Sequence, residues 1–213
     1  MSEPDDPSAS LSAGNFATWL AEMRRALRGE RDSDVPCGTC TACCTSSQFV
    51  HIAPDETDTL ARIPSALLFP APRLPRGHVL MGYDEHGHCP MLIDGACSIY
   101  ADRPRTCRTY DCRVFPASGT NVDDDPTKAA IAERSRRWQF DHPAADDTVL
   151  HDAVRAAAAF LVDHPEVHAG GTSPPPTQLA VLAIEVHEEF IGDKRPDVAA
   201  VTVRLRRDGS GPR

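Results

Sequence analysis

Large apolar side chains are scarce in this sequence. Leucine, isoleucine, valine and phenylalanine together supply only about 20 % of the 213 residues, and alanine accounts for much of the 41 % hydrophobic content. Chains below this level tend not to collapse into a stable core. A domain with so thin a core usually needs cross-links, and the eight cysteines are the obvious candidates for them.

Lysine is also scarce, and long apolar runs are absent. Two lysines and 20 arginines face 31 acidic residues, so the net charge is −9. Such an acidic chain lacks the basic surface that nonspecific nucleic-acid binding requires, so we expect no nucleic-acid partner. No stretch approaches the ~18 apolar residues of a membrane span, and we expect no membrane partner.

The first residues are acidic and carry no basic-then-apolar signal segment. We therefore expect a cytoplasmic location. Thiols are kept reduced there, and clustered cysteines in such a compartment indicate a metal site before they indicate disulfides.

The sequence predicts an α+β fold, in which a small, loop-rich cysteine and metal module with short antiparallel strands is flanked by helices. Residues 1–14 lack periodicity and are predicted to be disordered. Residues 15–29 predict an amphipathic helix that begins after Asn15 and ends at Gly29. Residues 37–116 form the predicted metal-binding domain, residues 125–192 a helical C-terminal region, and residues 193–213 a strand and a tail.

Shorter patterns predict the elements inside these regions. Strands are expected at residues 48–52, 79–83 and 89–92, the last two joined as a hairpin or meander, with a loop over residues 64–75. Proline positions place a short helix between residues 54 and 64. Further helices are expected at residues 125–140, at 177–190, and from Asp146 or Asp147 to about residue 161. Alternation predicts a strand at residues 198–205.

The first cysteine group packs four thiols into eight residues: Cys37, Cys40, Cys43 and Cys44. Two intervening residues are the spacing at which a turning backbone brings two sulfurs to one metal centre. Gly38 permits the tight turn, and the small neighbouring residues let backbone amides approach the sulfurs. This group strongly indicates metal binding.

The second group has wider spacing and comprises Cys89, Cys97, Cys107 and Cys112. Seven, nine and four residues separate its members, unlike the pairs of a zinc finger. Such spacing suits one metal centre assembled from separate loops. Alternatively, one or two of these cysteines are ligands of the metal centre of the first group.

The adjacent pair Cys43 and Cys44 limits the geometry of the first group. Neighbouring side chains point to opposite faces of an extended backbone and diverge by about 100° in a helical turn. The two thiols are therefore poorly placed to share one small tetrahedral ion. Either one binds metal while the other packs, or they serve different centres.

Arginines crowd the second group, at positions 103, 105, 108 and 113. Guanidinium groups beside a thiolate centre would offset its negative charge and lower the pKa of the thiols. Alternatively, these arginines pair with Asp84, Asp94, Asp102 and Asp111. His86 and His88 flank the loop before Cys89, where imidazole is a second type of zinc ligand.

These residues together resemble a known family. The pattern includes Cys37, Cys40, Cys43 and Cys44, then C-P-x-L, G-x-C-x-I-Y and R-P-x-x-C-R-x-Y, the last three starting at Cys89, Gly95 and Arg103. It is similar to the YkgJ-type cysteine-cluster family, which is described as zinc- or iron-chelating. The resemblance covers residues 37–116 and implies metal binding. A related cysteine motif occurs in a flagellin lysine N-methylase described as using an iron–sulfur cluster, which favours iron–sulfur over zinc.

Two cofactors therefore stand as hypotheses, an iron–sulfur cluster and Zn²⁺. The first predicts a redox or electron-transfer protein with a [4Fe–4S] cluster held by Cys37, Cys40, one of Cys43 or Cys44, and one of Cys89, Cys97 or Cys107. The second predicts a zinc module that stabilises the thin core and binds a partner protein. A cluster-assisted group-transfer enzyme ranks third, because the sequence shows no phosphate loop, serine elbow or other catalytic constellation.

Overall fold

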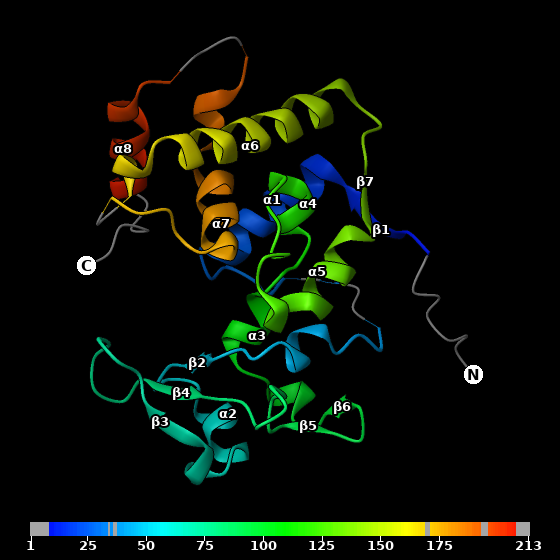
Figure 1. The fold of residues 1–213 in the computed structure, drawn as a ribbon, viewed down its shortest axis with the longest axis vertical. Coiled ribbons are helices and arrows are strands. Elements are labelled where there is room, and N and C mark those ends of the chain that lie inside the picture. The colour runs from blue at the N-terminus through cyan, green and yellow to red at the C-terminus, as the bar shows by residue number, and fades with distance from the viewer. Residues whose placement is uncertain (1–8, 34, 36–37, 169–170, 193–195, 208–213) are drawn as a thin grey trace. The chain divides into compact units, whose positions relative to one another are not determined.

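The computed structural model describes residues 9–33, 35, 38–168, 171–192 and 196–207, which fall into two compact units. Of these residues, 26–111 and 123–134 make up the first unit. The second unit contains residues 9–25, 112–122 and 135–207. Helices and short strands occur in both units, so the chain has an α+β fold, as predicted (Figure 1).

The first unit is built around a three-stranded antiparallel sheet with the order β2-β4-β3. Its strands are β2 (Val50–Ile52), β3 (Leu68–Pro70) and β4 (Val79–Met81), which lie side by side in Figure 1. Residues 50 and 68 both face Met81, which fixes the register. A separate two-stranded hairpin pairs β5 (Leu92–Ile93) with β6 (Ala96–Cys97).

Short helices complete this unit. They are the α-helices α2 (Thr57–Arg62), α3 (Arg105–Thr109) and α5 (Ala129–Arg136), which ends in the second unit, and the 3₁₀ helices η1 (Ala42–Thr45), η2 (Ser65–Leu67), η3 (Tyr100–Asp102) and η4 (Pro126–Lys128). The buried carboxylate of Glu56 accepts hydrogen bonds from the backbone N–H groups of Ala53 and Arg105, so it ties the start of α2 to the start of α3.

The apolar core of the first unit is small. It contains six buried residues: Val50, Ile52, Ile63, Met81, Met91 and Ile99. Two of the cysteines, Cys89 and Cys97, pack against this cluster. The thin core that composition predicts is therefore a local property of the unit that carries most of the cysteines.

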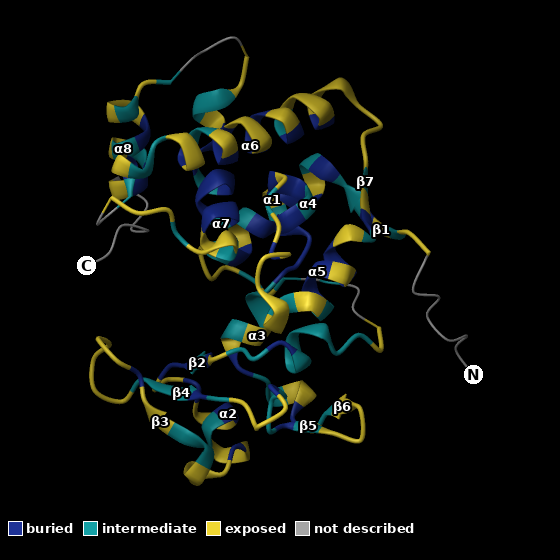
Figure 2. Ribbon diagram, in the orientation of Figure 1, coloured by how far each residue is buried: buried dark blue, intermediate teal, exposed yellow. Residues whose placement is uncertain are grey.

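The second unit is mainly helical. It contains β1 (Leu11–Asn15), α1 (Phe16–Leu27, whose last two residues lie in the first unit), α4 (Val114–Ser118), β7 (Trp138–Asp141), α6 (Ala145–Asp163), η5 (Pro165–Val167), α7 (Pro176–Val186), η6 (His187–Phe190) and α8 (Val198–Arg207). Helix α7 packs against α4, α6 and α8, and Figure 2 shows it largely in the buried colour. Strands β1 and β7 pair in parallel.

Asp147 joins three segments of this unit. Its carboxylate accepts hydrogen bonds from the Asn15 side chain at 2.7 Å, from the Ala17 N–H at 3.0 Å and from the Ala144 N–H at 2.9 Å. These bonds hold its pKa below the ordinary value, with the two backbone donors acting most strongly. One carboxylate therefore caps the starts of both α1 and α6.

Several predicted local features are confirmed. Asn15 Oδ1 accepts from the Thr18 N–H at 2.8 Å, as an N-cap of α1 does, and Gly29 adopts a φ of +73° just after that helix. Asp125 accepts from the Thr127 N–H at the start of η4. Helix α6 begins with Asp147 in its first turn.

Other predictions are wrong, because pairing between segments distant in sequence determines the secondary structure at these positions. Residues 11–14, predicted to be disordered, lie in β1, and residues 138–140, predicted to end a helix, lie in β7. The proline loop over residues 64–75 contains β3, whose partner is β4. The predicted pairing of residues 79–83 with 89–92 is absent from the described residues; β4 pairs with β2 and β3, and β5 pairs with β6.

The predicted strand at residues 198–205 is helix α8. Its buried residues Val201 and Leu205 are four positions apart, which places them on one helical face. The same apolar residues also alternate with polar ones, so the pattern is compatible with the 3.6-residue period of a helix and with the two-residue period of a strand. Among the described residues, no helix is both long and apolar enough to cross a membrane.

Candidate metal centre

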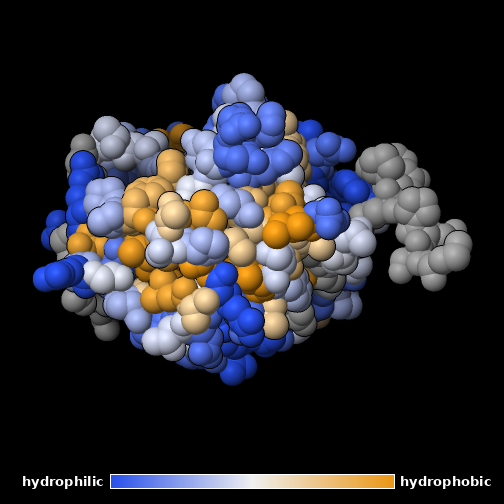
Figure 3. Space-filling model, turned by 90° about the horizontal axis from the view of Figure 1, so that it is seen from below, coloured by the Kyte–Doolittle hydropathy of each residue, from blue (hydrophilic) through white to orange (hydrophobic). Residues whose placement is uncertain are grey.

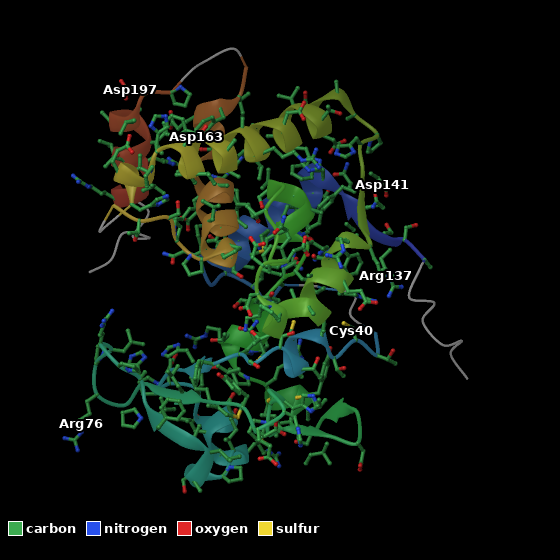
Figure 4. All side chains as sticks on the ribbon, in the orientation of Figure 1. Cys40, Arg76, Arg137, Asp141, Asp163 and Asp197 are labelled. Carbon is green, nitrogen blue, oxygen red and sulfur yellow. The ribbon has the colours of Figure 1, made fainter. Side chains whose placement is uncertain are left out.

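The first cysteine group begins with a tight turn. Gly38 adopts a φ of +57°, a region that favours glycine. Cys40 follows it, and Cys43 and Cys44 lie in η1, where the Cys44 N–H donates to the Thr41 carbonyl at 2.8 Å. All three thiols belong to half-buried residues; Cys37 lies outside the described residues. Figure 4 labels Cys40 in this segment.

Two backbone hydrogen bonds join this group to the second one. The Cys89 N–H donates to the Cys44 carbonyl at 2.7 Å, and the Ser47 N–H donates to the Gly87 carbonyl at 2.9 Å. They run in opposite directions between the same two segments. The two cysteine groups, separated by more than 40 residues in sequence, are therefore fixed to one another by the backbone.

Three other thiols of the first unit act on the thiol of Cys107: those of Cys44, Cys89 and Cys97. The pKa of Cys107 is raised to about 12, first by desolvation and then by repulsion from the other three thiolates, while Arg103 lowers it. Cys107 as a residue reaches solvent, but protein atoms crowd its thiol. These thiols come from four separate segments: η1, the Cys89 turn, β6 and α3.

The Cys89 thiol receives two backbone donors. The N–H groups of Met91 and Leu92 hydrogen-bond to it and lower its pKa, although desolvation raises the pKa more. The Leu92 N–H also approaches the Cys89 carbonyl at 2.9 Å, so this segment is a tight turn. Backbone donors of this kind stabilise a thiolate bound to metal. Sequence reasoning placed such amides around the first group and missed them here.

Cys112 differs from the other described cysteines in its surroundings. It belongs to the second unit and is buried, with 7 % of its surface exposed. Its sulfur accepts a hydrogen bond from the Trp138 indole N–H at 3.1 Å. This environment is that of a packed thiol beside a buried aromatic ring.

The neighbouring arginines have mixed roles. Arg103 lies over the Tyr100 ring at 4.1 Å and lowers the pKa of Cys107. Arg105 pairs with Asp55 at 2.8 Å, and Arg108 lies 3.8 Å from Asp32. Arg113 is buried in the second unit, where it donates to the Ala13 carbonyl. The charge-offset role is therefore supported for Arg103 at Cys107.

The two histidines before Cys89 sit in a loop organised by Asp84. The backbone N–H groups of His86 and His88 both donate to Asp84 Oδ1, at 2.9 and 2.8 Å. Their rings stand 6.1 Å apart, and His86 lies 3.8 Å from Glu85. Within the described residues, no three histidine, cysteine or acidic side chains are close enough to form a metal-binding group.

Lys128 supports the site in a way that the sequence did not indicate. Its ammonium group donates to the Ser46 carbonyl at 2.5 Å and to the Ser47 carbonyl at 3.2 Å. These carbonyls directly follow η1. The ammonium group therefore holds the end of the first cysteine segment in place.

Comparison with known proteins gives one match, to a family model. No curated protein and no solved structure matches the chain. Residues 36–131, under half of the chain, match the family model CxxCxxCC, described as "Putative zinc- or iron-chelating domain". The match agrees with the resemblance seen in the motifs and supports metal binding by this part of the chain, with zinc or iron as the metal.

Proposed function

We propose that the first unit binds an iron–sulfur cluster, of the [4Fe–4S] type, and serves a redox or electron-transfer role. The observation that carries this proposal is the backbone hydrogen bond from Cys89 to Cys44, which fixes the two cysteine groups to one another. The thiols of Cys44, Cys89 and Cys97 also contribute, after burial, to the raised pKa of Cys107. A [4Fe–4S] cluster takes four cysteine ligands. Cys40 and Cys43 lie in the same unit, so the supply of sulfur exceeds what one tetrahedral zinc ion needs.

The ligands proposed are Cys44, Cys89, Cys97 and Cys107. This set keeps one member of the adjacent pair Cys43 and Cys44 and replaces Cys37 and Cys40 of the sequence-based set with thiols of the second group. Cys112 is proposed as a packed thiol rather than a ligand, because it lies in the other unit and accepts the Trp138 N–H.

The donor set fits such a group chemically. Thiols whose pKa is raised by desolvation and by mutual repulsion are costly to ionise alone, and a cationic iron centre removes that cost. The Met91 and Leu92 N–H groups can donate to the Cys89 sulfur in the bound state. When bound, the cluster would supply one-electron redox chemistry, while Arg103 partly offsets the negative charge of the thiolates.

A redox role implies a redox partner protein and a compartment that keeps thiols reduced. The cytoplasm is such a compartment, and we propose it as the location. The partner would approach near Cys107, because this residue reaches solvent although protein atoms crowd its thiol. Short distance between a centre and the surface favours electron transfer.

The decisive experiment is purification without air, followed by assays of iron, acid-labile sulfide and zinc. Iron and sulfide in equal amounts, with a broad visible absorption band, are expected. A colourless protein that holds zinc alone after growth with ample iron would overturn the proposal.

Two matched variants test the ligand set. Cys107→Ser should remove most of the bound iron, because the thiolate of Cys107 is a proposed ligand. Cys112→Ser should keep it, because that thiol packs in the second unit. Equal loss of iron in both variants, or none in Cys107→Ser, would contradict the assignment.

A structural zinc module is the second candidate, favoured by an exposed aromatic cluster. Phe49, 57 % exposed, contacts the rings of Phe69 and Tyr83 at 6.1 and 5.1 Å. Figure 3 shows hydrophobic side chains at the surface of the molecule on one face. Such clusters occur where partner proteins bind. Zinc in the purified protein, together with a partner lost in Phe49→Ser, would support this function.

A further inference from the structure

A cavity of about 430 Å³ opens in the second unit, beside β7 and the first half of α6. This volume lies within the range of small-molecule sites, and every lining residue belongs to the second unit. Two segments and Pro116 of α4 build its walls. The first segment is β7 with its flanks, where Figure 4 labels Arg137 and Asp141, and it contributes Arg136, Trp138, Gln139, Phe140 and His142.

Helix α6 supplies the facing wall. Thr148, His151, Asp152 and Arg155 line the cavity at intervals of three, one and three residues, which places them on one helical face. His151 is buried, whereas the other three are exposed. The helix therefore presents a buried imidazole between groups that can reach a ligand from solvent.

The charge of the lining is positive. Two guanidinium groups, from Arg136 and Arg155, face one carboxylate, from Asp152. This excess stands out in a chain whose net charge is −9. Arg155 makes one described hydrogen bond, a long one of 3.5 Å to the Pro116 carbonyl, so its guanidinium keeps N–H donors for a ligand.

The buried imidazole of His151 in the cavity wall is neutral and is held in place by its neighbours. His151 lies 3.3 Å from the Pro116 carbonyl through Nε2 and 2.8 Å from His142 through Nδ1. Its ring stacks on Phe16 with centroids 4.1 Å apart. Burial lowers the pKa of His151 to about 4, so at neutral pH the imidazole adds no charge.

We propose that this cavity binds a small organic anion whose carboxylate or phosphate group is held by Arg155 and Arg136. Guanidinium groups recognise both kinds of oxyanion through paired N–H donors. Pro116, Trp138 and Phe140 would face the carbon skeleton of the ligand. Asp152 favours a ligand that also carries a hydroxyl or amino donor beside the anionic group. The inference is independent of the metal centre, since the cavity lies wholly in the second unit.

Calorimetric titration of the full chain tests the proposal with three probes: benzoate, phenyl phosphate and uncharged benzamide. Saturable one-to-one binding of benzoate or phenyl phosphate is expected, and the stronger of the two identifies the anionic group. Benzamide should bind at least about tenfold more weakly, because it lacks the charge. Absence of saturable binding by both anions, or equal binding of benzamide, would overturn the proposal.

Variants locate the site. Arg155→Gln should weaken anion binding about tenfold or more, and Arg155→Lys should weaken it less, because it keeps the charge and loses the paired donors. Arg206→Gln is the matched control, since it removes an exposed arginine from α8, outside the cavity. Unchanged affinity in Arg155→Gln, or an equal loss in Arg206→Gln, would refute the assignment.

Discussion

The Cys89 N–H donates a hydrogen bond to the Cys44 carbonyl at 2.7 Å, and this bond connects two cysteine groups that are far apart in sequence. A second bond, from the Ser47 N–H to the Gly87 carbonyl, lies beside it. Together they place the Cys89 turn, with its two N–H donors, next to η1. The predictions below follow from this junction and from the buried groups of the second unit.

Replacement of Gly87 with alanine should disturb the junction. Gly87 has a φ of +79°, and an added Cβ would lie 2.4 Å from Ser47 Oγ. The backbone strain alone costs about 1–2 kcal/mol in a residue with a side chain. Gly87→Ala should therefore lower both the free energy of unfolding and the amount of metal retained, measured by urea denaturation and metal analysis.

Gly95→Ala is the control for that experiment. Gly95 has nearly the same φ, +74°, but nothing lies within 4 Å of its added Cβ. It should show the strain without the clash, and so a smaller loss of stability. If both variants lose the same stability and metal, the Ser47 contact has no role.

Replacement of Lys128 with methionine should loosen the end of the first cysteine segment. The Ser46 and Ser47 carbonyls would lose their shared ammonium donor, and hydrogen bonds to charged groups contribute about 1.5–3 kcal/mol each when lost from a protected site. Because Lys128 is half-buried, we expect a loss of about 1–2 kcal/mol in unfolding free energy. Lys128→Arg should restore most of it, and wild-type stability in Lys128→Met would contradict the role.

Removal of the metal should affect the first unit selectively. Its main apolar cluster holds six buried residues, and we expect a bound metal to add to the stability of so small a core. After chelation, hydrogen exchange in peptides covering residues 38–111 should accelerate by at least about tenfold, whereas α6 and α7 should keep their protection. Uniform acceleration across both units, or none, would show that metal binding does not stabilise this core.

Acid should destabilise the second unit through His151. Its pKa falls from an ordinary value near 6.5 to about 4 in the folded chain, so the unfolded chain binds the proton first as pH falls. Stability from this group is complete above pH 6.5 and is lost between pH 6.5 and about 4, by about 3 kcal/mol in total.

Urea unfolding at several pH values checks this slope in the wild type and in His151→Gln, whose amide can still donate to Pro116. In His151→Gln, the free energy of unfolding should lose most of its dependence on pH between pH 6.5 and about 4. Some will remain, because burial also lowers the pKa of His187. An unchanged slope in the variant would exclude His151 as its source.

The sequence by itself determined the features that depend on neighbouring residues. Cysteine spacing located the metal-binding segment, and Asn15, Gly29 and Asp125 marked helix ends because capping is a local interaction. The helices at α1 and α6 followed from apolar periodicity and side-chain caps. The scarcity of large apolar residues predicted the small core beside the cysteines.

Only the tertiary structure decided which distant segments meet. Strand β1 forms because it pairs with β7, more than 120 residues later in the sequence. Neither strand has a local sequence pattern from which its pairing partner can be predicted. The same holds for the meeting of Cys44 with Cys89, and for the separation of Cys112 into the second unit. Residues 198–205 fit two periods equally well, and burial of Val201 and Leu205 against the helical unit selected the helix. Spacing identifies residues able to bind metal, but the packing of separate loops selects which of their thiols come together.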